Sequence, residues 1–255
     1  MTLFSETAGH GPDLVLLHGW GLHSGVWEET AAALAENFRV TLIDLPGHGR
    51  SPWLAGHYSL TTLAQQLLAS APPHAMWLGW SLGGIIALHL AAQHPERVNK
   101  LMLVASTPKF VNAADWQHGV AAGTLDEFVR ALTSDYRSCI KRFLALQLRG
   151  SAQAAQTLRR LNAIAFRHGE PDPRALSAGL ALLRDSDLRD ELGSITCPAL
   201  VIAGERDTLT PVDAQRYLAA HLPQAHLSVI AGAGHAPFLS HTQEFMRVLN
   251  EFMHQ

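Results

Sequence analysis

The sequence predicts an α/β fold, with a mostly parallel, doubly wound sheet and one inserted helical segment. Three observations predict it. Short apolar runs recur along the chain, helical patterns lie between them, and this alternation stops between residues 110 and 185. Strands that alternate with helices are typical of a parallel sheet covered on both faces. With 255 residues, 47% hydrophobic and 16% charged, the chain is long enough to bury a substantial core.

The apolar runs predict strands that are buried on both faces. Each is four to six residues long, and most are apolar throughout rather than alternating with polar residues. Continuous runs of this kind are typical of central parallel strands. The expected strands cover residues 14–17, 38–43, 75–78, 101–104, 199–202 and 227–230.

The segments between the runs predict helices. Residues 24–37 and 60–70 place apolar side chains at helical spacing, and residues 241–253 read as a terminal amphipathic helix. Residues 82–93 are nearly all Leu, Ile and Ala, so we expect that helix to be buried.

The segment 110–185 contains helical patterns and no convincing strand. The patterns are LDEFVRAL, YRSCIKRFLALQL and AAQTLRRLNAIAF, separated by short Gly- or Pro-containing stretches. We therefore expect a core formed by residues 1–109 and 186–255, with residues 110–185 as a helical lid.

Composition excludes several classes of protein. No apolar run approaches the ~20 residues that span a bilayer, and the N-terminus lacks the basic and apolar regions of a signal peptide. The two cysteines, Cys139 and Cys197, are too few for a disulfide framework, so a reducing cytoplasm is the simplest location. The 15 histidines show no zinc-ligand spacing with Cys or His, so we expect no metal. A monomer is expected.

The net charge of −3 is unevenly distributed. Residues 130–167 carry a net charge of +7, and the rest of the chain carries −10. The basic residues are Arg130, Arg137, Lys141, Arg142, Arg149, Arg159, Arg160 and Arg167, beside a single acid, Asp135. Two interpretations stay open, a solvated helical face and a docking surface for an acidic partner. Nucleic acid is disfavoured because no nucleic-acid motif is present.

The motif GWSLG at residues 79–83 predicts a nucleophilic serine, Ser81. It follows an apolar run and opens a buried helix, which is the setting of a nucleophile elbow. A sharp strand-to-helix turn exposes the hydroxyl, and the helix N-terminus directs free N–H groups at the site. The alternative is a turn of small residues that packs a helix on a sheet.

A serine nucleophile needs a base, and the base needs an orienting carboxylate. Asp207 follows the run ALVIAG and His235 follows LSVI, so both fall at carboxyl ends of predicted strands, in the order Ser, acid, His. Rival groups precede strands, flank turns or start helices. They are Asp185, Asp187, Asp190 and Asp213 among the acids, and His221, His226 and His241 among the histidines.

An acyl-transfer site also needs donors for the oxyanion. We expect the backbone N–H groups of Leu82, directly after the nucleophile, and of Trp20 in the HGWG loop. Trp20 and Trp80 would wall the pocket, although ordinary core packing is the alternative for each. In the turn-rich loop DLPGHGRS (44–51), Asp44, His48 and Arg50 are interpreted as structural.

These motifs together resemble those of α/β-hydrolase-fold serine hydrolases. HGWG, DLPGHGRS, GWSLGG, HPERV, GERDTLTP and AGAGHAPF occur in the order found in that family, between about residues 14 and 252. The resemblance implies a hydrolase that needs no metal or organic cofactor.

A closer resemblance is to the pimeloyl-acyl-carrier-protein methyl ester esterases of biotin synthesis. It is carried by HGWGLHSGVW, WLGWSLGG, RFLALQ at 142–147 and GHAPFLSH. It implies a serine carboxylesterase that hydrolyses the methyl ester of pimeloyl-acyl-carrier protein. Trp20, Ser81, Leu82 and His235 would surround the ester. The acyl channel would be lined by Phe143, Leu144, Ala145, Leu146 and Gln147.

The same resemblance implies that lid arginines hold the acidic carrier protein. Arg142 and Arg159 match the family's docking positions. Two other positions read Ser138 and Ala155, and Arg137 and Arg160 nearby would substitute for them. Alternatives stay open: a broad short-chain carboxylesterase without a carrier partner, a C–C bond hydrolase or haloperoxidase-like enzyme, and a catalytically idle receptor.

Overall fold

The computed structural model describes residues 2–54, 56, 58–132, 135–147 and 153–255. These residues form a seven-stranded sheet in the order β1-β3-β2-β4-β5-β6-β7. Strands β2 to β7 run parallel, and β1 pairs antiparallel with β3 at one edge. The strands are β1 Ser5–Ala8, β2 Asp13–Leu17, β3 Arg39–Ile43, β4 Ala75–Trp80, β5 Val98–Val104, β6 Ala199–Gly204 and β7 Ala225–Ile230. The predicted α/β class is confirmed.

Strands β2 to β7 coincide with the six predicted apolar runs, whereas β1 was not predicted. Its four residues, SETA, are all exposed and contain no apolar run. Only its pairing with β3, from Ser5 opposite Ile43 to Ala8 opposite Val40, makes it a strand.

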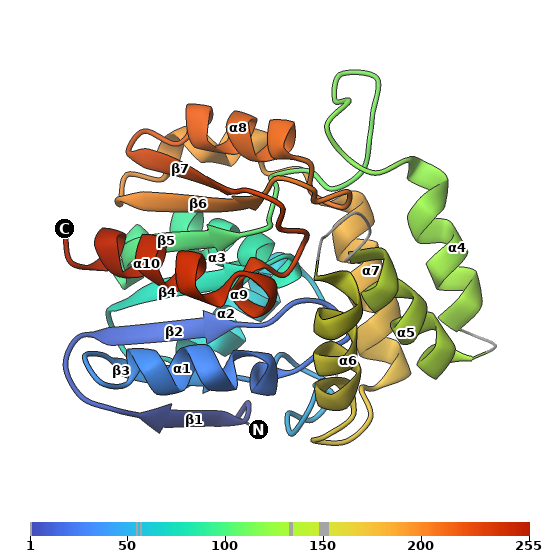
Figure 1. Cartoon of the computed structure of the whole chain (residues 1–255), viewed down its shortest axis with the longest axis horizontal. Helices are drawn as coiled ribbons and strands as arrows, with labels where there is room; N and C mark the ends of the chain where they lie inside the picture. The colour runs from blue at the N-terminus through green and yellow to red at the C-terminus, as the bar shows by residue number, and fades with distance from the viewer. Residues whose placement is uncertain (1, 55, 57, 133–134, 148–152) are drawn as a thin grey trace.

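Helices cover both faces of the sheet. Figure 1 shows α1 (Glu28–Leu34) and α10 (Thr242–Met253) in front of the sheet, with α2 (Leu60–Ser70) and α3 (Leu82–Gln93) behind it. Helix α3 is buried over almost its whole length, as its apolar sequence predicts. The remaining core elements are η1 Ser24–Trp27, η2 Pro95–Arg97, η3 Arg189–Ser194, α8 Val212–His221 and α9 Pro237–Ser240.

Between β5 and β6, the described residues form four α-helices that stand at the carboxyl ends of the strands (Figure 1). They are α4 Ala122–Leu132, α5 Tyr136–Gln147, α6 Ala154–Ala165 and α7 Pro173–Asp185. We call them the lid. No helix among the described residues is long and apolar enough to cross a membrane.

Candidate active site

Ser81 lies at the turn between β4 and α3, in a backbone conformation that side chains rarely adopt. Its φ is 54° and its ψ is −117°. Its amide donates to the carbonyl of Val104 on the neighbouring strand, and its carbonyl accepts from Ser106 Oγ at 3.0 Å. The surrounding sheet therefore holds the strained residue, as is common at functional sites.

Two glycines after Ser81 permit this tight turn. A Cβ on Gly83 would lie 2.5 Å from the carbonyl oxygen of His18, and a Cβ on Gly84 would lie 2.6 Å from the Ser106 side chain. The start of α3 can thus approach the backbone of the HGWG loop. Side chains at these positions would separate the two segments that are predicted to hold the oxyanion.

His235 and Asp207 form a buried pair. His235 Nδ1 donates to Asp207 Oδ2 over 2.8 Å, and both side chains are fully buried. The carboxylate also accepts from the Leu209 and Thr210 amides and from Thr210 Oγ1, at 2.6 to 3.0 Å. Gln215 in turn donates to the Thr210 carbonyl at 2.7 Å. These bonds fix the carboxylate, which fixes the ring.

The other ring nitrogen, His235 Nε2, is buried and has no hydrogen-bond partner among the described residues, and the same is true of Ser81 Oγ. Trp80, next to Ser81, donates from its indole nitrogen to the His235 carbonyl at 2.7 Å, so the loop that carries His235 is tied to the elbow. The structure thus brings His235 and Asp207 together and ties the His235 loop to the residue before Ser81, while the Ser81 hydroxyl and His235 Nε2 are buried without a partner among the described residues.

The rival groups lie elsewhere. Asp185, Asp187 and Asp213 form exposed or half-buried ion pairs with arginines, and Asp187 also pairs with Lys109. Asp190 and His226 are exposed. His221 bonds to the Tyr217 carbonyl, and His241 to Ser240.

Of the two predicted oxyanion donors, the Trp20 N–H lies in the loop after β2 and the Leu82 N–H lies at the start of α3. Leu82 is the first residue of α3, where backbone N–H groups have no partner within the helix. The loop that contains Trp20 is fixed by His18, whose Nε2 accepts from the Leu45 amide at 2.9 Å and whose Nδ1 donates to the Gly19 carbonyl at 2.8 Å. Burial and the neighbouring His48 lower the pKa of His18 to about 3, so this ring is neutral.

Side chains of the loop DLPGHGRS form hydrogen bonds that fix the loop itself. Asp44 is buried and accepts from the amides of Ser24 and Arg50, and Arg50 Nε approaches the same carboxylate at 3.2 Å. His48 is buried beside Pro46, whose carbonyl lies 3.1 Å from its Nδ1. These contacts hold the loop beside the HGWG segment.

Comparison with known proteins identifies the family. A profile of the α/β hydrolase fold matches residues 12–242. A protein of Chromobacterium violaceum named "Pimeloyl-[acyl-carrier protein] methyl ester esterase" is 46% identical over 253 residues, which covers 99% of this chain and 98% of the relative. The chain belongs to this family of α/β hydrolases. A relative of the same name from Nitrosomonas europaea is 45% identical and covers 94% of this chain and 95% of its own.

Solved structures agree with the α/β-hydrolase fold. An esterase from Exiguobacterium antarcticum superposes with a TM-score of 0.89 at 24% identity, covering 99% of this chain and 96% of its own. A bromoperoxidase from Bacillus anthracis reaches a TM-score of 0.90 at 22% identity, with 99% and 95% covered. At these identities the likeness concerns the fold alone.

In this α/β hydrolase the lid closes over the site. Ser81 is 2% exposed, and His235 is fully buried. Trp20 packs edge-on against Phe143 of α5, with ring centroids 4.7 Å apart, and its indole nitrogen donates to the Leu176 carbonyl of α7 at 2.8 Å. Lid helices therefore contact the loop that is predicted to hold the oxyanion.

The five residues expected to line the acyl channel do not share one face of α5. Phe143 and Leu144 are buried, and Leu146 is half-buried. Ala145 is exposed, because successive helical residues point about 100° apart, and its place in an acyl channel stays a prediction. The side chain of Gln147 lies outside the described residues.

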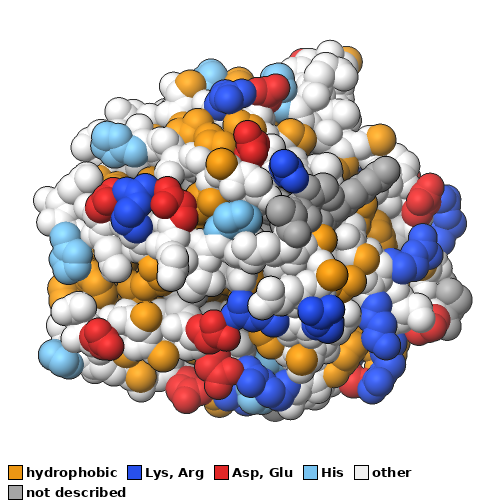
Figure 2. Space-filling model, in the orientation of Figure 1, with side chains coloured by type: hydrophobic (Ala, Val, Ile, Leu, Met, Phe, Trp, Pro, Cys, Tyr) orange, Lys and Arg blue, Asp and Glu red, His pale blue; other side chains and the backbone are white. Residues whose placement is uncertain are grey.

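The four predicted docking arginines differ in whether they form an ion pair. Arg142 and Arg159 are exposed and form no ion pair with any described residue. Arg137 pairs with Glu170 of the lid, and Arg160 pairs with Glu29 of α1 at 2.6 Å. Figure 2 shows Lys and Arg side chains gathered over α5 and α6. Arg149 lies outside the described residues.

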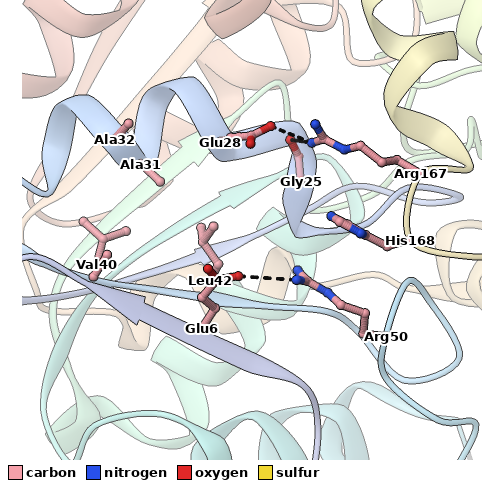
Figure 3. Close-up of a pocket in the computed structure, with 11 residues that line it drawn as sticks. Glu6, Gly25, Glu28, Ala31, Ala32, Val40, Leu42, Arg50, Arg167 and His168 are labelled. Atoms are coloured by element: carbon pink, nitrogen blue, oxygen red, sulfur yellow. Dashed lines mark hydrogen bonds and ion pairs between the residues drawn. The ribbon is translucent and has the colours of Figure 1, made fainter.

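Arginines also fasten the lid to the core. Arg167, just after α6, reaches Glu28 of α1 at 2.6 Å, beside a pocket of about 380 Å³ between α1 and the β1–β3 edge (Figure 3). His23 Nε2 donates to the Ile164 carbonyl at 2.8 Å. Together with Arg160–Glu29, these bonds join α6 to the segment η1–α1.

Several residues of the site escape prediction from sequence. Ser106 and Gln215 support the loops but lie in none of the motifs named above, whereas His18 and Thr210 lie in HGWG and GERDTLTP without a predicted role. The chain position of Thr210, three residues after Asp207, is a usable signal, because Asp side chains often accept from backbone amides two or three residues later.

Proposed function

We propose that this chain hydrolyses the methyl ester of pimeloyl-acyl-carrier protein, releasing methanol and the free pimeloyl-carrier acid in biotin biosynthesis. The observation that carries the proposal is the full-length similarity, at 41–46% identity, to relatives that bear the name of this esterase. The buried arrangement of Ser81, His235 and Asp207 supplies the matching chemistry. A cytoplasmic site of action accords with the two free cysteines.

In the first half of the reaction, Ser81 Oγ attacks the ester carbonyl while His235 Nε2 takes the hydroxyl proton. Asp207 holds the Nδ1–H tautomer and stabilises the imidazolium. The N–H groups of Trp20 and Leu82 bind the oxyanion. The C–O bond to the methoxy group then breaks, and methoxide leaves as methanol with the proton from His235, which gives the acyl-enzyme.

In the second half, water attacks the acyl-enzyme and gives its proton to His235. The bond between the acyl carbon and Ser81 Oγ breaks, and the proton returns to the serine. The free carboxylate remains at the end of the carrier-bound chain. Each donor lost from an oxyanion site typically costs ~2.7–4 kcal/mol of barrier, so both donors contribute strongly.

Docking of the carrier is supported by the surface of the lid. Arg142 and Arg159 are exposed and unpaired among the described side chains, so they are available to carboxylates of an acidic partner. Opposite charge increases the rate of encounter, and arginine suits bidentate contact. Arg137 and Arg160 already have acidic partners, so we assign them a smaller part in docking.

The deciding experiment compares turnover of the pimeloyl-carrier methyl ester with that of a matched free methyl ester, with Ser81→Ala as the blank. We expect a kcat/KM at least tenfold higher for the carrier-bound ester. Equal or poorer turnover of that ester would indicate a broad short-chain carboxylesterase, and the basic lid would then be a solvated helical face.

A further inference from the structure

Gly179 occupies a position where glycine is costly for local structure. It lies in the interior of α7, and glycine there disfavours the helix relative to alanine. The residue is buried, and its φ is not in the left-handed region. Backbone conformation therefore gives no reason for glycine, and the reason has to be a close neighbour.

That neighbour is the Trp20 indole. A Cβ at residue 179 would lie 2.7 Å from Trp20 Cδ1, 3.1 Å from Trp20 Nε1 and 3.4 Å from Leu82 Cδ2. The first distance is shorter than real Cβ contacts, and an indole ring cannot bend aside. Both side chains in contact belong to the two residues whose N–H groups are predicted to bind the oxyanion.

The same face of α7 also bonds to the indole. Leu176 lies one helical turn before Gly179, and its carbonyl accepts from Trp20 Nε1 at 2.8 Å. On the other side of the loop, a Cβ on Gly19 would lie 3.0 Å from the Trp80 ring. The segment that contains Trp20 is thus enclosed between β4 and the lid.

We infer that Gly179 and the Leu176 carbonyl form a seat for the Trp20 indole, and that Gly179 is a positioning residue for the oxyanion site. The inference rests on the proposed function, because it assigns Trp20 to the oxyanion. The inference links the lid to the reaction, because the backbone N–H of Trp20 is held in place only while α7 packs on the indole ring.

The test is Gly179→Ala, assayed with a free p-nitrophenyl ester that needs no carrier. A methyl group at this position displaces the ring, and small displacements of catalytic groups can reduce turnover ~100-fold. We expect kcat to fall tenfold or more, with KM within about threefold of the wild type. The matched control is Gly123→Ala in lid helix α4, where a Cβ would meet nothing within 4 Å. This control should keep wild-type kcat.

A second readout does not depend on activity. In spectra of protein with ¹⁵N-labelled tryptophan, the Trp20 indole N–H signal should shift in Gly179→Ala and exchange faster with solvent. A wild-type kcat would overturn the inference whatever the indole signal, because the oxyanion site would then not depend on Gly179. An unchanged indole signal would overturn it as well, because the added methyl group would then not have displaced the ring. A lost preference for the carrier-bound ester, with the Gly179 effect intact, would refute only the proposed function.

A variant that avoids overpacking covers the case in which Gly179→Ala does not fold. Trp20→Phe removes the indole N–H that donates to the Leu176 carbonyl and makes the side chain smaller. The Trp20 loop therefore loses its contact with the seat on α7. We expect kcat to fall about tenfold, and adding Gly179→Ala should then cost less than it does alone. Wild-type kcat in Trp20→Phe would overturn the inference.

Discussion

Arg160 of the lid and Glu29 of the core lie 2.6 Å apart, and the same guanidinium donates to the Leu239 carbonyl at 2.7 Å. Leu239 follows shortly after His235, so one lid side chain touches both helix α1 and the segment beside the proposed base. This contact and the neighbouring pair Arg167–Glu28 hold the lid over a serine that is 2% exposed.

Weakening this contact should increase access to Ser81. Glu29→Gln removes the carboxylate that pairs with Arg160, and surface ion pairs contribute ~0–1 kcal/mol, which corresponds to at most about a fivefold change. We expect a fluorophosphonate to label Ser81 two- to fivefold faster in this variant. Glu36→Gln, an exposed carboxylate outside the ion pairs of the described residues, is the control. Equal labelling rates in wild type and Glu29→Gln would contradict the idea.

The pair of His235 and Asp207 predicts a large effect of Asp207→Asn. An amide at this position favours the wrong tautomer of the imidazole, and the corresponding loss in a serine triad is ~10⁴-fold in kcat. Turnover of a free ester measures it, with Asp213→Asn on the exposed surface of α8 as the control. A variant that retained a tenth of wild-type kcat would show that another acid orients the base.

Reversal of charge on the lid should separate the two substrates. Arg142→Glu with Arg159→Glu should lower kcat/KM for the carrier-bound ester at least tenfold, because both guanidinium groups are exposed and unpaired among the described residues. The free ester should be unaffected. The wild-type preference should also weaken as salt increases from 50 to 200 mM. Arg216→Glu on α8 serves as the control, and a matching loss there would argue against a defined docking face.

His48 predicts a loss of stability in acid. Burial lowers the pKa of His48 to about 4 from its usual 6.5, so the unfolded chain binds the proton more readily between these values. The free energy of unfolding should therefore be intact above pH 6.5 and fall as the pH decreases toward 4. At pH 5 this one group accounts for about 2 kcal/mol.

Urea unfolding at pH 7 and pH 5 measures this loss. His48→Gln should lose about 2 kcal/mol less than the wild type over the same interval, because glutamine has no proton to take up. Identical losses in the two proteins would show that His48 does not contribute.

Much of this molecule follows from local patterns in the sequence. Strands buried on both faces are apolar throughout, so β2 to β7 are visible as runs. Ser81, Asp207 and His235 could be predicted because each follows such a strand, and carboxyl ends of parallel strands meet at one edge of the sheet. Strand β1 could not be predicted, because its residues are exposed and are extended only through their pairing with β3.

The remaining features depend on contacts between distant segments. Nothing near Arg160 in the sequence indicates that Glu29 neutralises it, and nothing near Gly179 indicates a tryptophan from the first strand-to-helix loop. Exposure of Ala145 follows from the helical rotation of α5, whereas a resemblance in sequence treats its five residues as one stretch. Such relationships exist only after the lid has packed on the core.

The lid leaves the sheet after β5 and returns at β6, and these two strands are hydrogen-bonded neighbours. Because the strands are parallel, the chain leaves β5 at its carboxyl end and enters β6 at its amino end, but the two stems of the lid meet beside the sheet. The Leu188 amide donates to the Pro108 carbonyl at 2.9 Å, and Lys109 forms a β-bridge with Asp187. A segment inserted between such close anchor points can change in length and sequence while the strands keep their register. The architecture therefore makes the lid a module that evolution or an engineer can exchange while the elbow and its glycines stay the same, provided that the new segment keeps a seat for the Trp20 indole.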